Sequence, residues 1–245
     1  MFSFFKKKKE PQRGPLLKVD LHSHLIPGID DGSQSLEESM ILIRKLHALG
    51  YEKLITTPHI MSDAYRNSAE NIYNGLALLR EEIEKEQLPV RIDAAAEYYL
   101  DDGFFDEMKK PRILSIGGKY LLFETSYFSK PLHIEEMIFA IGAAGYQPIM
   151  AHPERYRYIK DPEKEYTRLK DLGVFFQINL NSFGGHYGRQ AKHLAGYLSQ
   201  AGMIDFLGSD THHMKQVETL EKVFYLDAYH EIFTHNTIKN NELID

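Results

Sequence analysis

The stretch Val19-Asp20-Leu21-His22-Ser23-His24 predicts the end of a β-strand whose two faces differ in chemistry. Side chains alternate along a strand, so we expect Asp20, His22 and His24 to share the barrel-facing side, and Leu17, Val19 and Leu21 to face the helices. Two imidazoles and a carboxylate cost free energy to bury unless a partner offsets their desolvation, and a metal ion is such a partner. Two histidines on one strand can also be ordinary packed residues, so the stretch alone leaves both interpretations open.

Apolar runs of strand length recur along the rest of the chain, and each is followed by a helical pattern. Strands that alternate with helices indicate a parallel sheet, and about seven such units in this length favour an α/β barrel over an open sheet. Helix ends carry capping signals: Ser35 with Glu38, Gly50, Gly145, and Asp161 before Pro162. The predicted strands are residues 16–21, 53–57, 90–96, 120–124, 148–151, 174–180 and 205–208.

The composition is that of an ordinary globular chain with a sizeable core: 245 residues, 43% hydrophobic and 26% charged. We expect one domain over residues 16–245, preceded by a basic tail over residues 1–15. The chain has no cysteine. This excludes a disulfide framework, a thiolate zinc site and a cysteine nucleophile, so hydrolytic chemistry must use a hydroxyl, a carboxylate, an imidazole or a metal.

The charge is distributed unevenly between a basic leader and an acidic body. The whole chain carries −6, and without the lysine run Lys6–Lys9 the remainder carries −10. An acidic body argues against nucleic acid as a partner. The phenylalanines and lysines of the leader permit weak contact with an anionic membrane surface, and the alternative is a frayed, solvated tail. No stretch approaches the roughly 20 apolar residues of a spanning helix, so we expect a cytoplasmic protein, peripheral to the membrane at most.

Side chains of metal-ligand type follow five further predicted strands, all at the same end. In a parallel barrel the carboxyl ends of the strands converge on one face, where such folds carry out their chemistry. So many imidazoles and carboxylates at one end favour a polynuclear metal site over separate caps and hydrogen-bonded core groups. The candidate ligands are His22, His24, Asp31, His59, Glu97, Glu124, His152, Asp210 and His212.

The charge of this set suits several divalent ions. Four carboxylates bring −4, so three divalent ions leave a net +2, which attracts a phosphate dianion. Imidazole and carboxylate without thiolate fit Mn, Fe, Zn or Mg, and the affinity order does not choose among them. We predict that Asp20 is hydrogen-bonded to one ligand histidine; the alternative is a barrel-interior hydrogen bond unrelated to metal. The histidines without a comparable strand-end position are His47, His133, His186, His193, His213, His230 and His235.

Seven motifs in this order carry a resemblance to a known family. They are Asp20-Leu21-His22-Ser23-His24, Asp30-Asp31-Gly32-Ser33, Thr56-Thr57-Pro58-His59, Ala96-Glu97, Leu122-Phe123-Glu124, residues 148–156 (PIMAHPERY) and Gly208-Ser209-Asp210-Thr211-His212. The chain from Val19 onward resembles the polymerase and histidinol phosphatase (PHP) superfamily. Within it, the chain is similar to the bacterial metal-dependent protein-tyrosine phosphatases encoded with capsule and exopolysaccharide genes. The resemblance implies a distorted, TIM-like (β/α)7 barrel of the PHP type with three metal ions, of which we favour manganese over iron, zinc or magnesium.

The resemblance also implies a role for each site residue. It places one ion on His22, His24, Glu97 and Asp210, a second on Glu97, Glu124 and His152, and a third on Asp31, His59 and His212. It further implies that Arg155 binds the substrate phosphate, since a guanidinium clamps phosphate oxygens in a bidentate manner; a surface ion pair is the alternative. We take Arg155 and His212 as the catalytic residues. The chain departs from the family at Ser126-Tyr127-Phe128 and at Lys215, near which relatives often carry an arginine.

The activity implied by the resemblance is hydrolysis of phosphotyrosine by in-line attack of a metal-bound hydroxide. The implied partner is a phosphotyrosine protein, the tail of a bacterial tyrosine kinase of the capsule or exopolysaccharide type. The alternative is a small-molecule phosphomonoesterase such as a histidinol-phosphate phosphatase, which needs a more enclosed pocket with an anionic group for the substrate amine. A nuclease and a metal-free binding module fit less well, because the body is acidic and the ligand set is intact. The sequence does not determine the oligomeric state.

Overall fold

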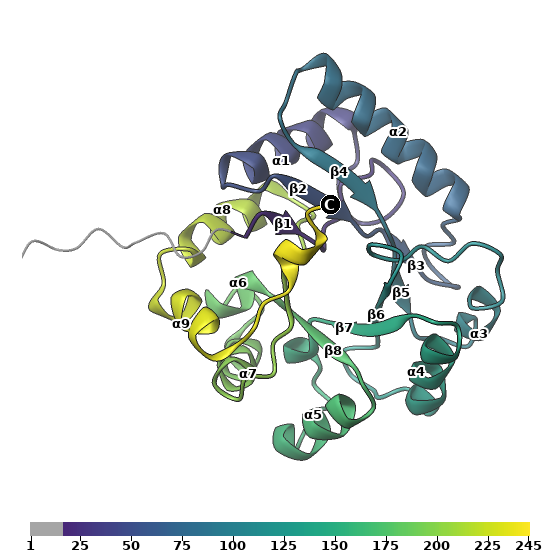
Figure 1. The fold of residues 1–245 in the computed structure, drawn as a ribbon, viewed down its shortest axis with the longest axis vertical. Coiled ribbons are helices and arrows are strands. Elements are labelled where there is room, and N and C mark those ends of the chain that lie inside the picture. Colours follow the sequence, from purple (N-terminus) through teal and green to yellow (C-terminus); the bar gives the residue numbers. More distant parts are fainter. Residues whose placement is uncertain (1–16) are drawn as a thin grey trace, which may run out of the picture.

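A computed structural model describes residues 17–245 of the chain. The strands form a ring and most helices pack around its outside (Figure 1). The strands are β1 (Val19–Asp20), β2 (Lys53–Thr56), β3 (His59–Ile60), β4 (Arg91–Ala94), β5 (Glu97–Tyr99), β6 (Tyr120–Glu124), β7 (Gln147–Ala151), β8 (Phe175–Asn179) and β9 (Phe206–Gly208). The leader Lys6–Lys9, on which the prediction of membrane contact rests, lies outside the described residues. Within residues 17–245, no helix is both long enough and apolar enough to cross a membrane.

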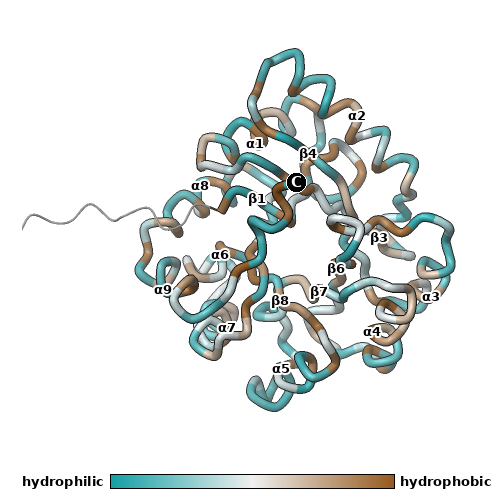
Figure 2. The backbone as a smooth tube through the Cα atoms, in the orientation of Figure 1, coloured by the Kyte–Doolittle hydropathy of each residue, from teal (hydrophilic) through white to brown (hydrophobic). Residues whose placement is uncertain are grey.

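The helices follow the strands in the alternation that the sequence predicts. They are α1 (Leu36–Ala48), α2 (Ala69–Lys85), α3 (Phe104–Glu107), α4 (Ile134–Ala143), α5 (Pro162–Asp171), α6 (Leu180–Phe183), α7 (Arg189–Gln200), α8 (Met214–Val223) and α9 (Asp227–His235), with 3-10 turns η1 (Pro153–Arg155) and η2 (Asn240–Leu243). Hydrophobic and hydrophilic residues alternate along the longer helices (Figure 2), as expected where one helix face packs on the sheet.

All strand pairs are parallel, and together they form a distorted β/α barrel. One sheet has the order β1-β2-β4 and the other the order β3-β5-β6-β7-β8-β9. The short strands β3 and β5 follow β2 and β4 after breaks of two residues and lie beyond the predicted ends at residues 57 and 96, so the second and third predicted strands each continue into a further short strand. A parallel bridge between Ser23 and Thr211 joins the segments that follow β1 and β9. The ring is therefore continuous at the carboxyl end of the strands, whereas β4 and β6 are not paired at the amino end.

Local signals at the helix ends explain where the helices begin and stop. Ser35 Oγ accepts a hydrogen bond from Glu38 N at 3.2 Å, and Asp161 Oδ1 accepts one from Lys164 N at 3.2 Å. Gly50 follows α1 with a φ of 111°, in the left-handed region that favours glycine. These caps were predicted from neighbouring residues alone, and the structure confirms them.

The barrel interior is filled by an apolar cluster that includes Val19, Leu21, Leu122 and Phe206. The rings of Tyr120 and Phe206 lie 5.2 Å apart although β6 and β9 are not neighbours, so this cluster crosses the barrel. The expectation that Val19 and Leu21 face the helices is therefore wrong. The reason is that β1 is only two residues long: alternation holds in a regular strand, and the irregular segment after Leu21 reorients the side chains that follow.

Candidate metal centre

The structure brings all nine predicted ligands together at the carboxyl end of the barrel. They form four overlapping groups, and within each group one nitrogen or oxygen atom from every side chain lies within 4.8 Å of the corresponding atoms of the others. The groups are His22, Glu97 and His152; His22, His24 and Asp210; His59, Glu97 and Glu124; and His24, Asp31, His59 and His212. All but Asp31 and His212 are buried. Because each group shares a member with another, the nine side chains form one continuous centre.

The Nε2 atoms of His22 and His24 approach each other to 3.3 Å at the middle of this centre. His22 Nδ1 lies 2.7 Å from Gln177 Oε1, and His24 Nδ1 lies 2.8 Å from Asp30 Oδ2. These oxygens can only accept hydrogen bonds, so in the neutral imidazoles both Nδ1 atoms carry the proton and both Nε2 atoms present a lone pair.

Two carboxylate oxygens join these lone pairs. Glu97 Oε2 lies 3.3 Å from His22 Nε2 and 3.5 Å from His24 Nε2, and Asp210 Oδ1 lies 3.4 and 3.6 Å from the same atoms. Glu97 Oε2 is buried and has no hydrogen-bond partner among residues 17–245. Four acceptors that face one another without a donor repel unless a cation lies between them. The residues therefore fit a divalent metal ion.

Glu97 links this set to the next strands. Its Oε1 lies 3.0 Å from His152 Nε2, and its Oε2 lies 3.2 Å from His59 Nδ1. Glu124 approaches the same two histidines: its Oε1 lies 3.2 Å from His59 Nδ1, and its Oε2 lies 3.8 Å from His152 Nε2. A carboxylate with each oxygen turned to a different imidazole is suited to bridge two ions.

Asp31 completes the centre at its exposed edge. Its Oδ1 lies 3.3 Å from His59 Nε2 and 3.4 Å from His212 Nε2. The ring of His212 stacks on that of His24 with centroids 4.0 Å apart. The centre thus opens to solvent on the side of Asp31, whose side chain is 55% exposed.

Two ligands have a backbone conformation that few side chains adopt. His152 follows β7 with a φ of 35°, and Asp210 follows β9 with a φ of 51°. Left-handed residues other than glycine are strained and cluster at functional sites. Gly208 leaves room beside another ligand, His22, because a Cβ at this position would lie 2.8 Å from His22 Cβ and 2.6 Å from Gln177 Nε2.

The two central histidines differ in their affinity for protons. Burial, together with the charge of the neighbouring His212, lowers the pKa of His24 to about 4. Burial also acts to lower the pKa of His22, but the carboxylates of Glu97 and Asp210 outweigh it and raise this pKa to about 9. Without an ion, a proton on His22 thus relieves part of the repulsion among the acceptors, and a metal ion must displace it.

Arg155 lies at the edge of the centre between two aromatic rings. Its guanidinium is 4.6 Å from the ring of Tyr127 and 4.2 Å from that of Tyr187, and Nη1 donates to Asp210 Oδ2 at 2.9 Å. The neighbouring Glu154 is engaged elsewhere, since its Oε1 accepts from Asn179 N and Ser182 Oγ. Arg155 is thus held next to a ligand by stacking and an ion pair.

The structure corrects the expected partner of Asp20. Its carboxylate accepts hydrogen bonds from Ser209 N at 2.8 Å and Ser209 Oγ at 2.6 Å, and contacts no histidine ring. Asp20 lies between Val19 and Leu21, which point into the barrel, so its own side chain points away from the ligands. Burial raises the pKa of Asp20 to about 6.

Sequence reasoning missed the residues that hold the ligands in place. Besides Asp30 and Gln177, they include Asn179, whose Nδ2 donates to Asp210 Oδ2 at 2.6 Å. Gln177 Nε2 in turn donates to Asn179 Oδ1 at 2.9 Å. The signal for this pair was present, since two amides alternate with apolar residues along the predicted sixth strand.

Comparison with known proteins identifies the family of the chain. The family described as "Capsular polysaccharide synthesis, CpsB/CapC" matches residues 18–239. The tyrosine-protein phosphatase YwqE of Bacillus subtilis is 28% identical over 212 residues, covering 85% of this chain and 84% of its own length. The tyrosine-protein phosphatase CpsB of Streptococcus pneumoniae is 27% identical over 203 residues, with coverages of 80% and 83%.

Solved structures show the same fold. One, from a study of YwqE and CpsB as metal-dependent tyrosine phosphatases, superposes with a TM-score of 0.76 at 27% identity, covering 90% of this chain and 96% of that one. The histidinol phosphate phosphatase of Lactococcus lactis superposes with a TM-score of 0.52 at 15% identity, covering 86% and 93%, a likeness that concerns the fold alone. With the match over residues 18–239, this chain belongs to the CpsB/CapC family of capsular polysaccharide synthesis.

Proposed function

We propose that this protein is a metal-dependent protein-tyrosine phosphatase. The observation that carries the proposal is the set of facing acceptors at His22, His24, Glu97 and Asp210, whose mutual repulsion a divalent cation relieves. Relatives at 27% and 28% identity are named tyrosine-protein phosphatases. When bound, divalent ions at such a centre supply the activated water and the positive charge that phosphate ester hydrolysis requires.

The proposed centre holds three ions, with manganese favoured over iron, zinc and magnesium. His22, His24, Glu97 and Asp210 hold the first, Glu97, Glu124 and His152 the second, and Asp31, His59 and His212 the third. The short distance from Glu97 Oε1 to His152 Nε2 supports the bridging role of Glu97. His59 Nδ1 lies 3.2 Å from both Glu97 Oε2 and Glu124 Oε1, so His59 connects the second and third sets.

Two residues have proposed roles toward the substrate. Arg155 directs its guanidinium at the edge of the centre, and its remaining N–H groups are free to bind oxygens of the phosphate. Tyr127 and Tyr187 both contact the guanidinium with their rings and restrict its motion, which reduces the entropy lost on binding. His212 Nδ1 donates to the backbone oxygen of Asp210 at 3.0 Å, so its Nε2 stays directed toward the proposed third ion.

The surroundings of Arg155 favour a protein substrate over histidinol phosphate. A cavity of about 370 Å³ lies beside Arg155, bordered by Tyr127, Arg157 and Arg189. Its one carboxylate, Glu154, is fully buried: Oε1 accepts hydrogen bonds from Asn179 N and Ser182 Oγ, and Oε2 is enclosed, so no exposed carboxylate in the lining faces a substrate amine. We therefore propose the phosphotyrosine tail of a cytoplasmic capsule-type tyrosine kinase as the substrate, acted on in the cytoplasm.

The proposal is tested by phosphate release from two substrates side by side. The protein is stripped with EDTA, reconstituted with manganese, and assayed on a phosphotyrosine peptide and on histidinol phosphate. We expect the peptide to be hydrolysed with the higher kcat/KM, and activity to be lost on stripping and restored by the metal. A higher kcat/KM for histidinol phosphate would indicate that the protein is a small-molecule phosphomonoesterase instead. Full activity after complete metal removal would contradict the metal mechanism.

A further inference from the structure

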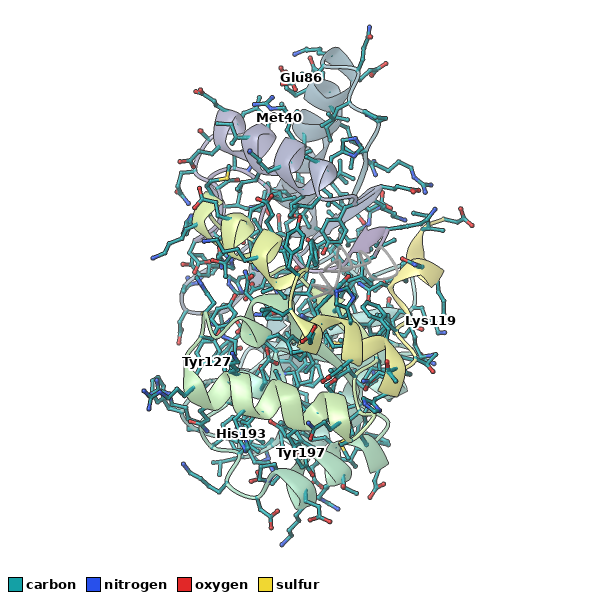
Figure 3. All side chains as sticks on the ribbon, turned by 90° about the vertical axis from the view of Figure 1, so that its left-hand side faces the viewer. Met40, Glu86, Lys119, Tyr127, His193 and Tyr197 are labelled. Atoms are coloured by element: carbon teal, nitrogen blue, oxygen red, sulfur yellow. The ribbon has the colours of Figure 1, made fainter. Side chains whose placement is uncertain are left out.

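The cavity beside Arg155 is a separate feature from the metal centre, although the two share a wall. It is lined by three segments: Tyr127 and Phe128 after β6, residues 154–157 at η1, and residues 187–191 at the start of α7. These segments follow the carboxyl ends of their strands. Tyr127 lies three residues after the carboxyl end of β6 and Lys119 lies just before its amino end, and the two residues are on opposite sides of the molecule (Figure 3). The cavity therefore opens on the same face as the metal ligands.

The lining is strongly cationic. It contains three arginines, of which Arg155 is paired with Asp210. Arg157 and Arg189 form no ion pair with any residue between positions 17 and 245, and Arg157 stacks over the exposed ring of Phe128 at 5.1 Å. The single carboxylate in the lining, Glu154, is buried and bonded to β8 and α6. Two guanidinium groups thus face a cavity in a body that is otherwise acidic.

The backbone adds further donors on the same side. Arg189, Gln190 and Ala191 form the first turn of α7 and line the cavity. The N-cap residue Gly188 provides no side-chain cap, and the first turn contains no acidic residue. The N–H groups of a first turn have no partner within the helix and favour negative charge. These groups reinforce the preference that the two arginines establish.

We propose that this cavity binds an anionic side chain that flanks the phosphotyrosine on the same substrate peptide. The inference rests on the proposed function and specifies its substrate. Arg155 forms the wall between cavity and centre, and an extended peptide advances about 3.3 Å per residue, so a residue near the phosphotyrosine reaches the cavity. Guanidinium groups bind carboxylate and phosphate alike, and the rings of Tyr127 and Phe128 also suit an aromatic ring. The ligand is therefore a glutamate, an aspartate or a second phosphotyrosine.

The test uses the metal-reconstituted full chain and peptides that differ only in their flanks. Each peptide has one phosphotyrosine, flanked on both sides by glutamines, by glutamates, or by a non-hydrolysable phosphonate analogue of phosphotyrosine. The test variant is Arg157→Ala with Arg189→Ala. The control is Arg91→Ala with Lys119→Ala, which removes the same charge from the amino end of β4 and β6. p-Nitrophenyl phosphate, which has no flanks, reports the turnover of the centre itself.

We expect wild type and control to prefer the anionic flanks by roughly threefold to tenfold in kcat/KM, as two solvent-exposed charge pairs provide. The double arginine variant should lose this preference and hydrolyse p-nitrophenyl phosphate at the wild-type rate. Whichever peptide has the higher kcat/KM, the one with glutamate flanks or the one with phosphonate flanks, identifies the natural flanking residue. Equal kcat/KM for all flanks in wild type, or a preference that survives in the double variant, would overturn the inference. Absence of turnover of every phosphotyrosine substrate and of p-nitrophenyl phosphate would instead overturn the proposed function, and the inference with it.

Discussion

At the scale of single residues, the centre depends on how its imidazoles are oriented. Gln177 and Asp30 each bind the Nδ1 of a central histidine, and thereby direct both Nε2 lone pairs to one point. A ligand whose outer nitrogen is fixed in this way binds metal more tightly, because ring rotation and the wrong tautomer are suppressed. These two side chains therefore contribute to metal affinity without contacting the ion.

Asp30→Asn tests this contribution while keeping the volume of the side chain. The amide loses the charge that fixes His24, so we expect manganese affinity to fall by roughly 10- to 100-fold, with activity recovering at saturating metal. The measurement is a titration of the stripped protein followed by activity and by calorimetry. His193→Ala, an exposed histidine on α7 (Figure 3), is the control. Wild-type affinity in Asp30→Asn would mean that Asp30 only shapes its loop.

Arg155→Ala tests the residue at the border of centre and cavity. We expect the turnover of phosphotyrosine peptide to fall by roughly 100-fold, the usual effect of removing one preorganised donor to a developing negative charge. Metal content, measured by mass spectrometry, should stay at the wild-type level, and Arg155→Lys should recover part of the rate. A rate unchanged by Arg155→Ala would reduce this arginine to an ion-pair partner of Asp210.

The nine candidate ligands could be predicted because their position at strand ends is a local property of the sequence. Their supporting residues were harder to predict. Asp30 and Asp31 are adjacent, and the sequence does not indicate which of them accepts the hydrogen bond from the Nδ1 of a ligand histidine. The predicted histidine partner of Asp20 is wrong because side-chain alternation does not continue beyond the end of β1.

At the scale of elements, the strands bring residues of different segments into very close contact. β9 ends at Gly208, which lies against the side chains of His22 and Gln177. No other residue type fits at this position without displacing a ligand or its partner. The close approach of β9 to the segment after β1 is thus part of the metal centre.

Gly208→Ala should both destabilise the protein and weaken the centre. The added Cβ would lie 2.6 Å from Gln177 Nε2, and such overpacking costs about 1–3 kcal/mol. Gly196→Ala within α7 is the matched control, because nothing lies within 4 Å of its Cβ; we expect it to stabilise the helix by about 0.5–1 kcal/mol. Urea unfolding with and without manganese measures both effects. Equal stability of the two variants would refute the close packing described for β9.

The helices were predicted better than the faces of the strands, for a physical reason. A cap such as that of Ser35 on Glu38 involves residues three positions apart, so it is visible in the sequence. The direction of a strand side chain depends on regular pairing over several residues, and β1 pairs over only two.

At the scale of the whole molecule, the C-terminal segment closes the barrel. Asn240 is buried in η2, and its side chain donates to Val19 O and Leu207 O and accepts from Leu207 N, at 2.7 to 2.9 Å. It thereby connects β1 and β9 at the end opposite the metal centre. Residues 221 positions apart meet here, which no local pattern could predict.

Asn240→Ala removes three hydrogen bonds and leaves three buried backbone groups unpaired, so we expect a loss of about 2–4 kcal/mol in the free energy of unfolding. Asn241→Ala, which removes one exposed hydrogen bond to Lys18 N, should cost less than about 1 kcal/mol. Chemical denaturation of the two variants makes the comparison. A loss in Asn240→Ala no larger than that in Asn241→Ala would show that the C-terminal segment is not needed to close the barrel.

The central claim is that nine converging side chains form a metal centre, and the most direct test locates the metal itself. Crystals of the manganese-reconstituted protein are measured on both sides of the manganese absorption edge. We predict anomalous peaks between His22, His24, Glu97 and Asp210 and at the two neighbouring ligand sets, with occupancy lost in Asp210→Ala. Absence of anomalous density among these residues at saturating manganese, or metal bound elsewhere in the molecule, would contradict the account.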